Sequence, residues 1–257
     1  MPEFQEIFFK DFVELKRGYD LPNDNIIDGE YPVVASTSIK SFHKEYKTLP
    51  PCVVTGRSGS LGAVQFINTP CWPLNTTLYV RNFKKNDPKY VYYFLKMMPF
   101  KSFNSGAGVP TLNQNHLHKL KIKIHNKSEQ QQIAEILTAY DDLIETNNQR
   151  IATLEQLAQQ IYKEWFVRMR FPGWEQAHFY HGVPDGWCVS ELLDFGKVVT
   201  GKTPSTLVQS NYGGGFPFIK TPDMHNNTFI FHTGESLTIK GVETQINQKI
   251  PAGAICT

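Results

Sequence analysis

One eight-residue segment has the spacing of a phosphate-binding loop. Residues 196–203 read Gly-Lys-Val-Val-Thr-Gly-Lys-Thr, which matches the loop that holds nucleotide phosphates in many hydrolases. That chemistry requires an apolar strand before the loop and, after it, a helix whose N-terminus faces the phosphates. Here Pro204 follows at once, and three glycines at 213–215 come soon after. Because a helix is disfavoured in this context, we do not expect nucleotide binding.

Other patterns of catalytic residues are also missing from the sequence. The triplet Gly-Arg-Ser at 56–58 lacks the glycine at position 60 that a nucleophile elbow needs. The polar-Pro-Pro-aromatic motif with which a methyltransferase holds a flipped base does not occur. The four cysteines stand far apart, at Cys52, Cys71, Cys188 and Cys256, and neither they nor the histidines have the spacing of metal ligands. We therefore expect a protein that is not an enzyme and holds no metal or cofactor.

Charge is unevenly distributed along the chain, although its net value is only +2. Residues 1–127 carry 17 Lys and Arg against 10 Asp and Glu, residues 128–167 carry 2 against 7, and residues 168–257 carry 7 against 7. The three segments therefore contribute +7, −5 and 0. A basic module beside an acidic one indicates that the first meets a polyanion and the second meets protein. The alternative is an uneven surface charge without a ligand.

The basic first segment contains the side chains that a DNA-binding face needs. DNA presents regularly spaced phosphates that attract Lys and Arg, and base edges that polar side chains read. Candidates for these contacts lie in turn-rich stretches: Ser36, Thr37, Ser38, Lys40, Lys44, Arg57, Arg81, Lys84, Lys85, Lys101, Asn104, Ser105 and Gln114. The alternative for each basic residue is a solvated surface charge, since most Lys and Arg side chains are exposed.

Two glycine-bearing segments are suited to a close approach to phosphate. In residues 56–59 a tight turn would direct Arg57 toward phosphate, and in residues 105–110 the backbone N–H groups would approach it. Hairpin or turn geometry alone explains the same glycines equally well. The sequence leaves both interpretations open.

These side chains need a framework, and residues 1–127 have the pattern of a mixed α/β globule. Short β-rich runs at 31–35, 52–55, 62–67 and 76–80 are separated by Gly, Pro, Asn and Ser. A helical pattern follows at 88–98. The hydrophobic content of 40% is enough to build packed cores.

The clearest local pattern spans residues 128–167, which contain neither Gly nor Pro. Ser128 and Gln131 predict a capping box at a helix start. Apolar positions then recur in alternating steps of four and three, which is the heptad pattern of a coiled coil. This helix seam consists of Ile133, Leu137, Tyr140, Ile144, Asn147, Ile151, Leu154, Ala158, Ile161 and Trp165. We expect a helix of about 60 Å that packs against another long helix; the alternative is burial within one larger fold.

The segment after this helix repeats the start of the chain. The pair Asp-Phe stands seven residues before a glycine twice, once before Gly18 and once before Gly201. Residues 31–34 and 51–55 then correspond, in the same order, to 216–219 and 251–257. Three ordered matches predict an internal repeat. Because the sequence ends within the second copy, we expect residues 184–257 to be incomplete and the least stable part.

Several motifs, in their order, resemble those of a known family. They are Thr-Gly-Arg-Ser-Gly-Ser-Leu-Gly at 55–62, Asn-Thr-Thr-Leu-Tyr-Val at 75–80, Pro-Thr-Leu-Asn at 110–113 and Glu-Gln-Gln-Gln-Ile-Ala at 129–134. This order resembles the first target-recognition domain and the start of the spacer helix in specificity subunits of type I restriction-modification enzymes. Pro-Asp-Gly-Trp at 184–187 and Thr-Gly-Lys-Thr-Pro-Ser at 200–205 resemble the opening of a second such domain.

The resemblance implies an α+β fold in three parts. These are a mixed α/β target-recognition domain at 1–127, a long coiled-coil-type spacer helix at 128–170, and the start of a second, incomplete recognition domain at 171–257. It also implies that each globule reads one part of a split DNA site. The helices would set the distance between the parts and bind DNA methyltransferase subunits, to which the restriction subunits attach.

We therefore expect a non-catalytic subunit that recognises double-stranded DNA, with methylation and cleavage supplied by the methyltransferase and restriction subunits. The resemblance also implies two long antiparallel helices, and because this sequence lacks the second of them, a homodimer through the long helix is a further expectation. The sequence has no run of about 18 apolar residues, so we expect a cytoplasmic protein without a membrane span. The alternative function is a coiled-coil interaction scaffold that does not bind DNA.

Overall fold

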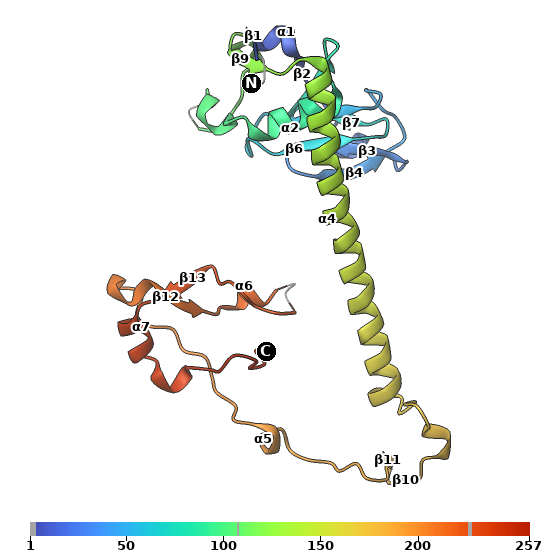
Figure 1. Cartoon of the computed structure of the whole chain (residues 1–257), viewed down its shortest axis with the longest axis vertical. Coiled ribbons are helices and arrows are strands. Elements are labelled where there is room, and N and C mark those ends of the chain that lie inside the picture. The colour runs from blue at the N-terminus through green and yellow to red at the C-terminus, as the bar shows by residue number, and fades with distance from the viewer. Residues whose placement is uncertain (1–3, 107, 226–227) are drawn as a thin grey trace. The chain divides into compact units, whose positions relative to one another are not determined.

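The computed structural model of the chain describes residues 4–106, 108–225 and 228–257 (Figure 1). The chain divides into two compact units, residues 1–167 and 168–257. The first unit contains a mixed α/β globule that continues into one long helix, and the second contains short strands and helical turns. The predicted combination of an α/β globule and a long helix is therefore confirmed. No described helix is both long and apolar enough to cross a bilayer.

Short strands dominate the globule of the first unit. They are β1 (Gln5–Phe8), β2 (Glu14–Arg17), β3 (Tyr31–Val34), β4 (Ile39–His43), β5 (Cys52–Gly56), β6 (Val64–Ile67), β7 (Trp72–Pro73), β8 (Thr77–Asn82) and β9 (Lys121–Ile124). The helices are α1 (Phe9–Phe12), α2 (Pro88–Met97), α3 (Gln114–His118) and α4 (Lys127–Tyr162), with 3₁₀ turns at Asn23–Asn25 and Phe100–Phe103. The four predicted β-rich runs form β3, β5, β6 and β8, and the predicted helix at 88–98 forms α2.

An antiparallel sheet with the strand order β2-β8-β5-β6 lies at the centre of the globule. Strand β5 is buried along its whole length, because β8 and β6 occupy its two edges and side chains cover both faces. Its successive residues Val53 and Val54 point to opposite faces and belong to two different apolar clusters, as a strand covered on both faces requires. Two further sheets have the orders β4-β3-β7 and β1-β9.

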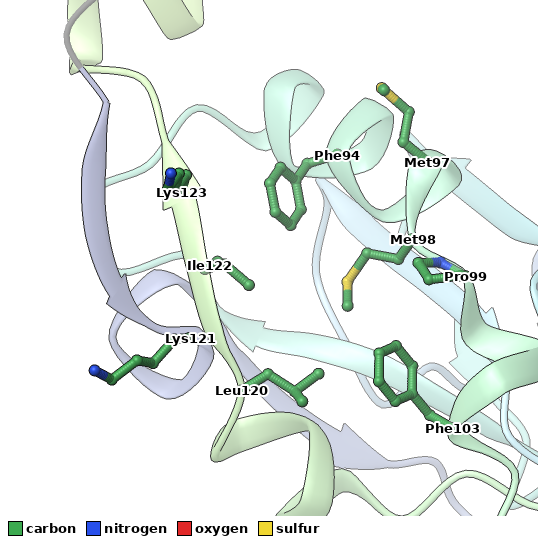
Figure 2. Close-up of a pocket in the computed structure, with 9 residues that line it drawn as sticks. All are labelled: Phe94, Met97, Met98, Pro99, Phe103, Leu120, Lys121, Ile122 and Lys123. Carbon is green, nitrogen blue, oxygen red and sulfur yellow. The ribbon is translucent and has the colours of Figure 1, made fainter.

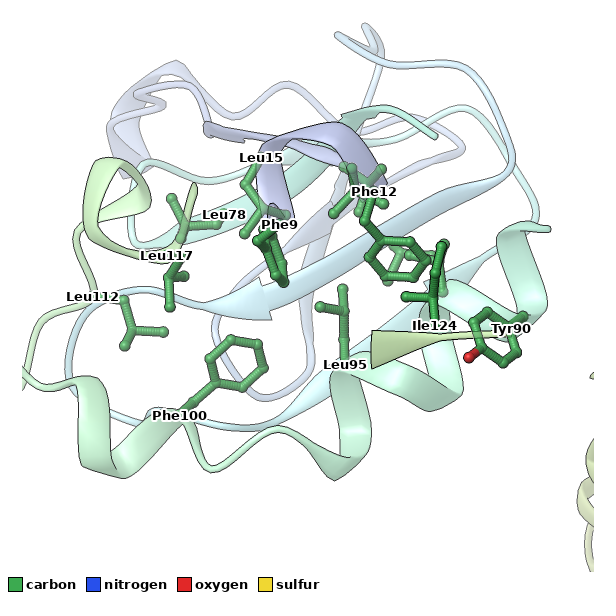
Figure 3. Close-up of a cluster of buried hydrophobic side chains, with 14 of the residues drawn as sticks. Phe9, Phe12, Leu15, Leu78, Tyr90, Leu95, Phe100, Leu112, Leu117 and Ile124 are labelled. Atoms are coloured by element: carbon green, nitrogen blue, oxygen red, sulfur yellow. The ribbon is translucent and has the colours of Figure 1, made fainter. Parts of the chain in front are cut away.

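The main core contains the buried aromatic and aliphatic side chains of β2, β5 and β8 together with those of helices α1 to α3. Phe9 and Phe12 from α1, Leu95 from α2 and Leu117 from α3 are all fully buried there. Figure 3 shows these side chains pointing into the same space. Each such side chain stabilises the fold by about 1.5–3 kcal/mol relative to exposure. This core fixes the sheet on which the candidate site is built.

The N-cap of helix α4 is Asn126, two residues before the predicted cap. The Asn126 side chain accepts a hydrogen bond from the N–H of Glu129 at 3.0 Å, and the Glu129 carboxylate accepts one from the N–H of Asn126 at 3.4 Å. The prediction of a capping box at Ser128 and Gln131 is therefore wrong. Asn and Ser are equally good N-caps, so the sequence pattern alone does not distinguish the two positions.

The first residue of the Gln triplet at 130–132 attaches α4 to the globule. Gln130 is 1% exposed, and its amide nitrogen donates to Asn86 Oδ1 at 2.8 Å and to the His125 carbonyl at 2.9 Å. Its amide oxygen accepts from the N–H of Asp87 at 3.1 Å. Asp87 is also the N-cap of α2, where its carboxylate accepts from the N–H groups of Lys89 and Tyr90. This Gln130 clamp therefore joins the first turns of both helices.

Helix α4 leaves the globule after its fourth turn. Ala134 is buried in the main core, and the Tyr93 hydroxyl donates to Asp141 Oδ2 at 2.9 Å. The remaining helix extends beyond the globule (Figure 1). The 36 residues of α4 span about 54 Å, and a π-helical turn at Lys163–Val167 follows. Trp165, the last predicted seam position, lies in this turn, where the angular spacing of an α-helix no longer applies.

The second unit has little core of its own. Its elements are β10 (Phe179–Tyr180), β11 (Val183–Pro184), α5 (Leu192–Phe195), β12 (Tyr212–Phe218), α6 (Thr221–Met224), β13 (Glu235–Leu237) and α7 (Ile239–Glu243), with 3₁₀ turns at Trp174–Gln176, Gln209–Asn211 and Ile246–Gln248. In the described part of this unit, the buried apolar residues are Leu237, Pro184 and Pro204. Residues 196–203, the phosphate-loop-like segment, form neither strand nor helix.

The two copies of the predicted repeat differ in burial. The Asp-Phe pair ends a four-residue helix in both, α1 and α5. Phe12 is fully buried, whereas Phe195 is 81% exposed. Residues 251–257 form no strand, unlike their counterpart β5. The second copy thus has the local structure of the first without its core.

We predict that Gln130→Ala lowers the free energy of unfolding of the first unit by about 3 kcal/mol, because it leaves three half-buried polar groups, at Asn86, Asp87 and His125, without their Gln130 partner. Urea denaturation followed by circular dichroism measures the loss. The control is Gln131→Ala, one residue along on the exposed face, for which we expect a change within about 0.5 kcal/mol. Equal effects of the two variants would contradict a structural role for the clamp.

Candidate nucleic-acid interface

Five loop segments meet at one end of the central sheet. They are residues 17–20, 36–38, 56–60, 75–76 and 104–111, and together we call them the loop rim. At this end of the sheet β2 ends at residue 17, β5 ends at residue 56 and β8 begins at residue 77. The segments that continue from these three residues therefore gather there. Ala107, within the predicted glycine-bearing loop, lies outside the described residues.

Hydrogen bonds to the Thr76 carbonyl join three of these segments. The Thr76 carbonyl accepts from the N–H of Arg57 at 2.8 Å and from the N–H of Ser58 at 3.1 Å. The Ser36 hydroxyl donates to the same carbonyl at 2.9 Å and to the Ser58 carbonyl at 3.3 Å. The turns after β3 and β5 are thereby held against the segment before β8.

The long loop 104–111 is attached to the same turn. The Arg57 carbonyl accepts from the N–H of Leu112 at 2.8 Å, and the N–H of Gly59 donates to the Pro110 carbonyl at 2.9 Å. Within the loop, Asn104 Oδ1 accepts from the N–H groups of Gly106 and Thr111 at 2.9 and 2.8 Å. The structure therefore brings the two glycine-bearing segments of the sequence together.

The turn after β5 requires glycine at its first position. A Cβ atom on Gly56 would lie 2.0 Å from the main-chain oxygen of Ser60, far closer than van der Waals contact allows. Gly59 differs, because it has a φ of +80° and open space around a Cβ position. Turn geometry thus explains Gly56, whereas Gly59 requires glycine only for its left-handed backbone.

Two arginines give the loop rim its positive charge. Burial lowers the pKa of Arg57, and the neighbouring Arg17 guanidinium lowers it further. Arg17 Nε donates to the Asn75 carbonyl at 3.2 Å, which holds this side chain at the rim. In the part of the chain that the structure describes, neither arginine has a carboxylate within ion-pair distance. Like charges held together without a counter-ion favour an anionic ligand.

The predicted contact residues are divided between the loop rim and other parts of the globule. Those in or next to the rim are Ser36, Thr37, Ser38, Lys40, Arg57, Asn104 and Ser105. Lys44 follows the opposite end of β4, and Arg81, Lys84 and Lys85 lie at the opposite end of β8. Arg81 is paired there with Glu14 at 3.2 Å. The predicted contact residues therefore do not all lie on one surface of the globule.

The remaining two candidates stand beside the rim. Lys101 is exposed on the 3₁₀ turn that precedes Asn104. Gln114 opens α3, two residues after the hydrogen bond between Leu112 and Arg57. Its Oε1 atom is buried and has no hydrogen-bond partner among the described residues. A buried amide oxygen in this position leaves a polar atom available for a donor that the chain does not supply.

Arg17 and Asn75 are rim residues that the sequence analysis does not single out. Asn75 orients its side chain by donating from Nδ2 to Asp20 Oδ1, and its carbonyl receives the Arg17 guanidinium. The available signal was the position of Arg17 directly before Gly18. A Cβ on Gly18 would lie 2.2 Å from the Leu74 carbonyl oxygen, so the chain must pass close to residue 74 there.

The second candidate surface is the helix seam on α4. Beyond the globule its large apolar side chains are between 37% and 63% exposed, and Asn147 and Ala158 are exposed among them. Ile136, Leu143 and Leu157 widen the apolar face. The described residues of the first unit do not cover this face. An apolar stripe of this length is typical of a surface that binds another helix.

Comparison with known proteins supports a specific class. A family model described as type I restriction modification DNA specificity domain matches residues 1–156 and 184–257. The chain is 31% identical over 206 residues to the type I restriction enzyme HindI specificity subunit of Haemophilus influenzae, covering 57% of this chain and 45% of that protein. It is 31% identical over 142 residues to the MjaIX specificity subunit of Methanocaldococcus jannaschii, covering 50% and 32%.

The fold is similar to a solved structure of the same kind. The crystal structure of the S subunit of a type I restriction-modification system from M. genitalium matches with a TM-score of 0.58 at 20% identity. The match covers 65% of this chain and 46% of that one. The chain therefore spans less than half the length of the relatives that it matches.

We predict that Gly56→Ala destabilises the first unit by about 2–3 kcal/mol, because the added methyl group forces the turn away from the Ser60 carbonyl. Gly59→Ala is the matched control in the same turn. It carries only the left-handed backbone strain of about 1 kcal/mol. Urea denaturation of the two variants measures the difference, and an equal loss for both would contradict the packing found at Gly56.

Proposed function

Because this chain belongs to the type I restriction-modification DNA specificity family, we propose that its N-terminal globule, residues 1–127, recognises one part of a split DNA target. The observation that carries the proposal is the loop rim. There Arg17 and Arg57 lie close together, with no carboxylate of the described residues within ion-pair distance of either, beside exposed Ser, Thr and Asn side chains. The two arginines would bind backbone phosphates, and the short polar side chains would read base edges.

Within the predicted set of contact residues, we assign the leading role to those at the rim. Main-chain hydrogen bonds fix the rim loops, so the side chains of Arg57, Thr37 and Ser38 do not have to maintain the fold. Preordered side chains lose less conformational entropy when they bind. The lysines at the opposite end of β8 would contribute only long-range attraction.

We propose that the chain itself is not catalytic, and that methylation and cleavage come from separate methyltransferase and restriction subunits. The relatives described above are named specificity subunits, which supports this division of labour. The acidic α4 would be the spacer that connects recognition to the methyltransferase subunits, and the restriction subunits would join through them. Residues 171–257, within the second unit, would begin a second recognition domain.

We further propose that the helix seam binds a helix of another chain. The candidates are a second copy of this chain and a methyltransferase subunit. A twofold pair through α4 would bring two recognition domains together, one from each copy. Asn147 would set the register of such a pair, because a polar side chain in an apolar seam is satisfied in few alignments.

We predict that Arg57→Ala weakens binding to a 30-base-pair duplex about tenfold at low salt. It should also reduce the slope of log affinity against log salt by about one, because one phosphate contact is lost. Fluorescence anisotropy over a salt series measures both quantities. The matched control is Arg81→Ala, which removes an arginine that is already paired with Glu14 at the other end of β8 and should change affinity less than about twofold. Equal losses would contradict the rim assignment, and binding without salt dependence, or no binding, would favour a scaffold.

We predict that Leu154→Asp disrupts self-association through α4, because it places a charge in the apolar seam. Gln156→Asp is the control, since residue 156 lies about 200° further round the helix and receives the same side chain. Sedimentation velocity at tens of micromolar should show a dimer for the parent and the control, and a monomer for Leu154→Asp. A parent chain that sediments as a monomer would exclude the dimer and leave a methyltransferase subunit as the proposed partner of the seam.

A further inference from the structure

An apolar groove lies along β9. It has a volume of about 370 Å³ and is lined by the end of α2, the 3₁₀ turn that follows it, Leu120 and the first three residues of β9, 121–123. Figure 2 shows Phe94, Met98, Phe103, Leu120 and Ile122 pointing toward this space. The strand β1 lies on the other side of β9 in the same view. The groove therefore borders the side of β9 that β1 leaves open.

The hydrogen-bond register shows which backbone groups face the open side. Ile122 pairs with Ile7, and Lys123 pairs with Glu6. The N–H of Phe9 donates to the Leu120 carbonyl at 2.8 Å, so alternate pairs from that point are the hydrogen-bonded ones. Lys123 and Lys121 consequently belong to the other kind of pair, in which N–H and C=O groups point away from the partner strand. In the described part of the chain, β9 pairs with no strand other than β1.

The lining of the groove agrees with an open strand edge. Successive side chains of a strand point to opposite faces, so one face alone would supply only every second residue of 120–123. All four residues border the groove, as expected where the strand backbone itself forms part of the wall. A groove with unpaired backbone groups on one wall and apolar side chains on the other is suited to an extended peptide.

The charges beside this edge define what kind of peptide fits. Lys121 and Lys123 are both exposed, and they flank the half-buried Ile122. Edge lysines repel basic strands and prevent unspecific pairing, but they attract carboxylates. We propose that the β9 groove is a protein-binding site that accepts an extended segment of alternating acidic and apolar residues from a partner protein, by addition of a strand to β9.

The paired backbone groups would be those of Lys121 and Lys123, and an apolar side chain of the segment would enter the space between Met98, Phe103 and Ile122. This site is distinct from DNA recognition at the loop rim. Duplex DNA offers neither a strand edge nor a side chain for an apolar groove, so the proposal does not depend on the proposed function.

The test uses the full chain and a fluorescein-labelled peptide of alternating glutamate and leucine. We expect this peptide to bind, and the same peptide with lysine in place of glutamate to bind at least about tenfold more weakly. Fluorescence anisotropy gives both affinities. Equal binding of the two peptides, or no binding of the acidic peptide at millimolar concentration, would overturn the proposal.

A pair of variants at one position distinguishes strand addition from attraction to the lysine charge. Lys123→Pro removes the charge and an N–H on the open edge without touching the β1 ladder, and we expect at least a fivefold greater loss of peptide affinity than in the control. Lys123→Ala is the matched control, because it removes the same charge and keeps the N–H that faces away from β1. Circular dichroism checks that both variants fold. Peptide binding that both variants weaken alike, or that Lys123→Pro leaves unchanged, would exclude pairing at this edge.

Discussion

The arrangement of the first unit depends on a single buried amide, that of Gln130. A helix that projects far from its globule acts as a lever, so a small rotation at its base displaces its far end by many ångströms. Apolar packing at the base resists separation but tolerates sliding, because dispersion has little directionality. The Gln130 amide instead makes three hydrogen bonds to fixed groups of the α2 start and the preceding loop. These bonds define the direction in which α4 leaves the globule.

The loop rim is built on a different principle, in which main-chain groups and the short side chains of Ser36 and Asn104 carry the structure and the Arg57 side chain remains available. The Thr76 carbonyl receives donors from two other segments, and the Arg57 carbonyl receives one from a third. The Arg57 guanidinium is consequently free of a structural task while burial and Arg17 lower its pKa. A site that holds two cations at some electrostatic cost regains that free energy when an anion binds. Gln114 beside the rim likewise has a buried amide oxygen without a hydrogen-bond partner among the described residues.

The sequence predicted elements well and the site only in part. Short β-rich runs separated by Gly, Pro, Asn and Ser located β3, β5, β6 and β8, because those signals are local. The capping box was misplaced by two residues, since Asn126 and Ser128 are equivalent in propensity and only the buried Gln130 selects between them. The candidate lysines and arginines were chosen by type, and type does not show which end of a strand a residue occupies. Arg57 and Arg81 were therefore grouped, although β5 and β8 place them at opposite ends of one sheet.

The exposed seam on α4 follows from the same geometry. An isolated helix is only marginally stable in water, and the globule covers only the first turns of α4, up to the contact of Tyr93 with Asp141. The later turns expose Ile144, Ile151 and Leu154 by more than half. Burying one such side chain contributes about 1.5–3 kcal/mol, so covering several in succession stabilises the outer helix far more than its intrinsic propensity does. A second helix that covered the stripe, as proposed, would therefore take a fixed position relative to the loop rim.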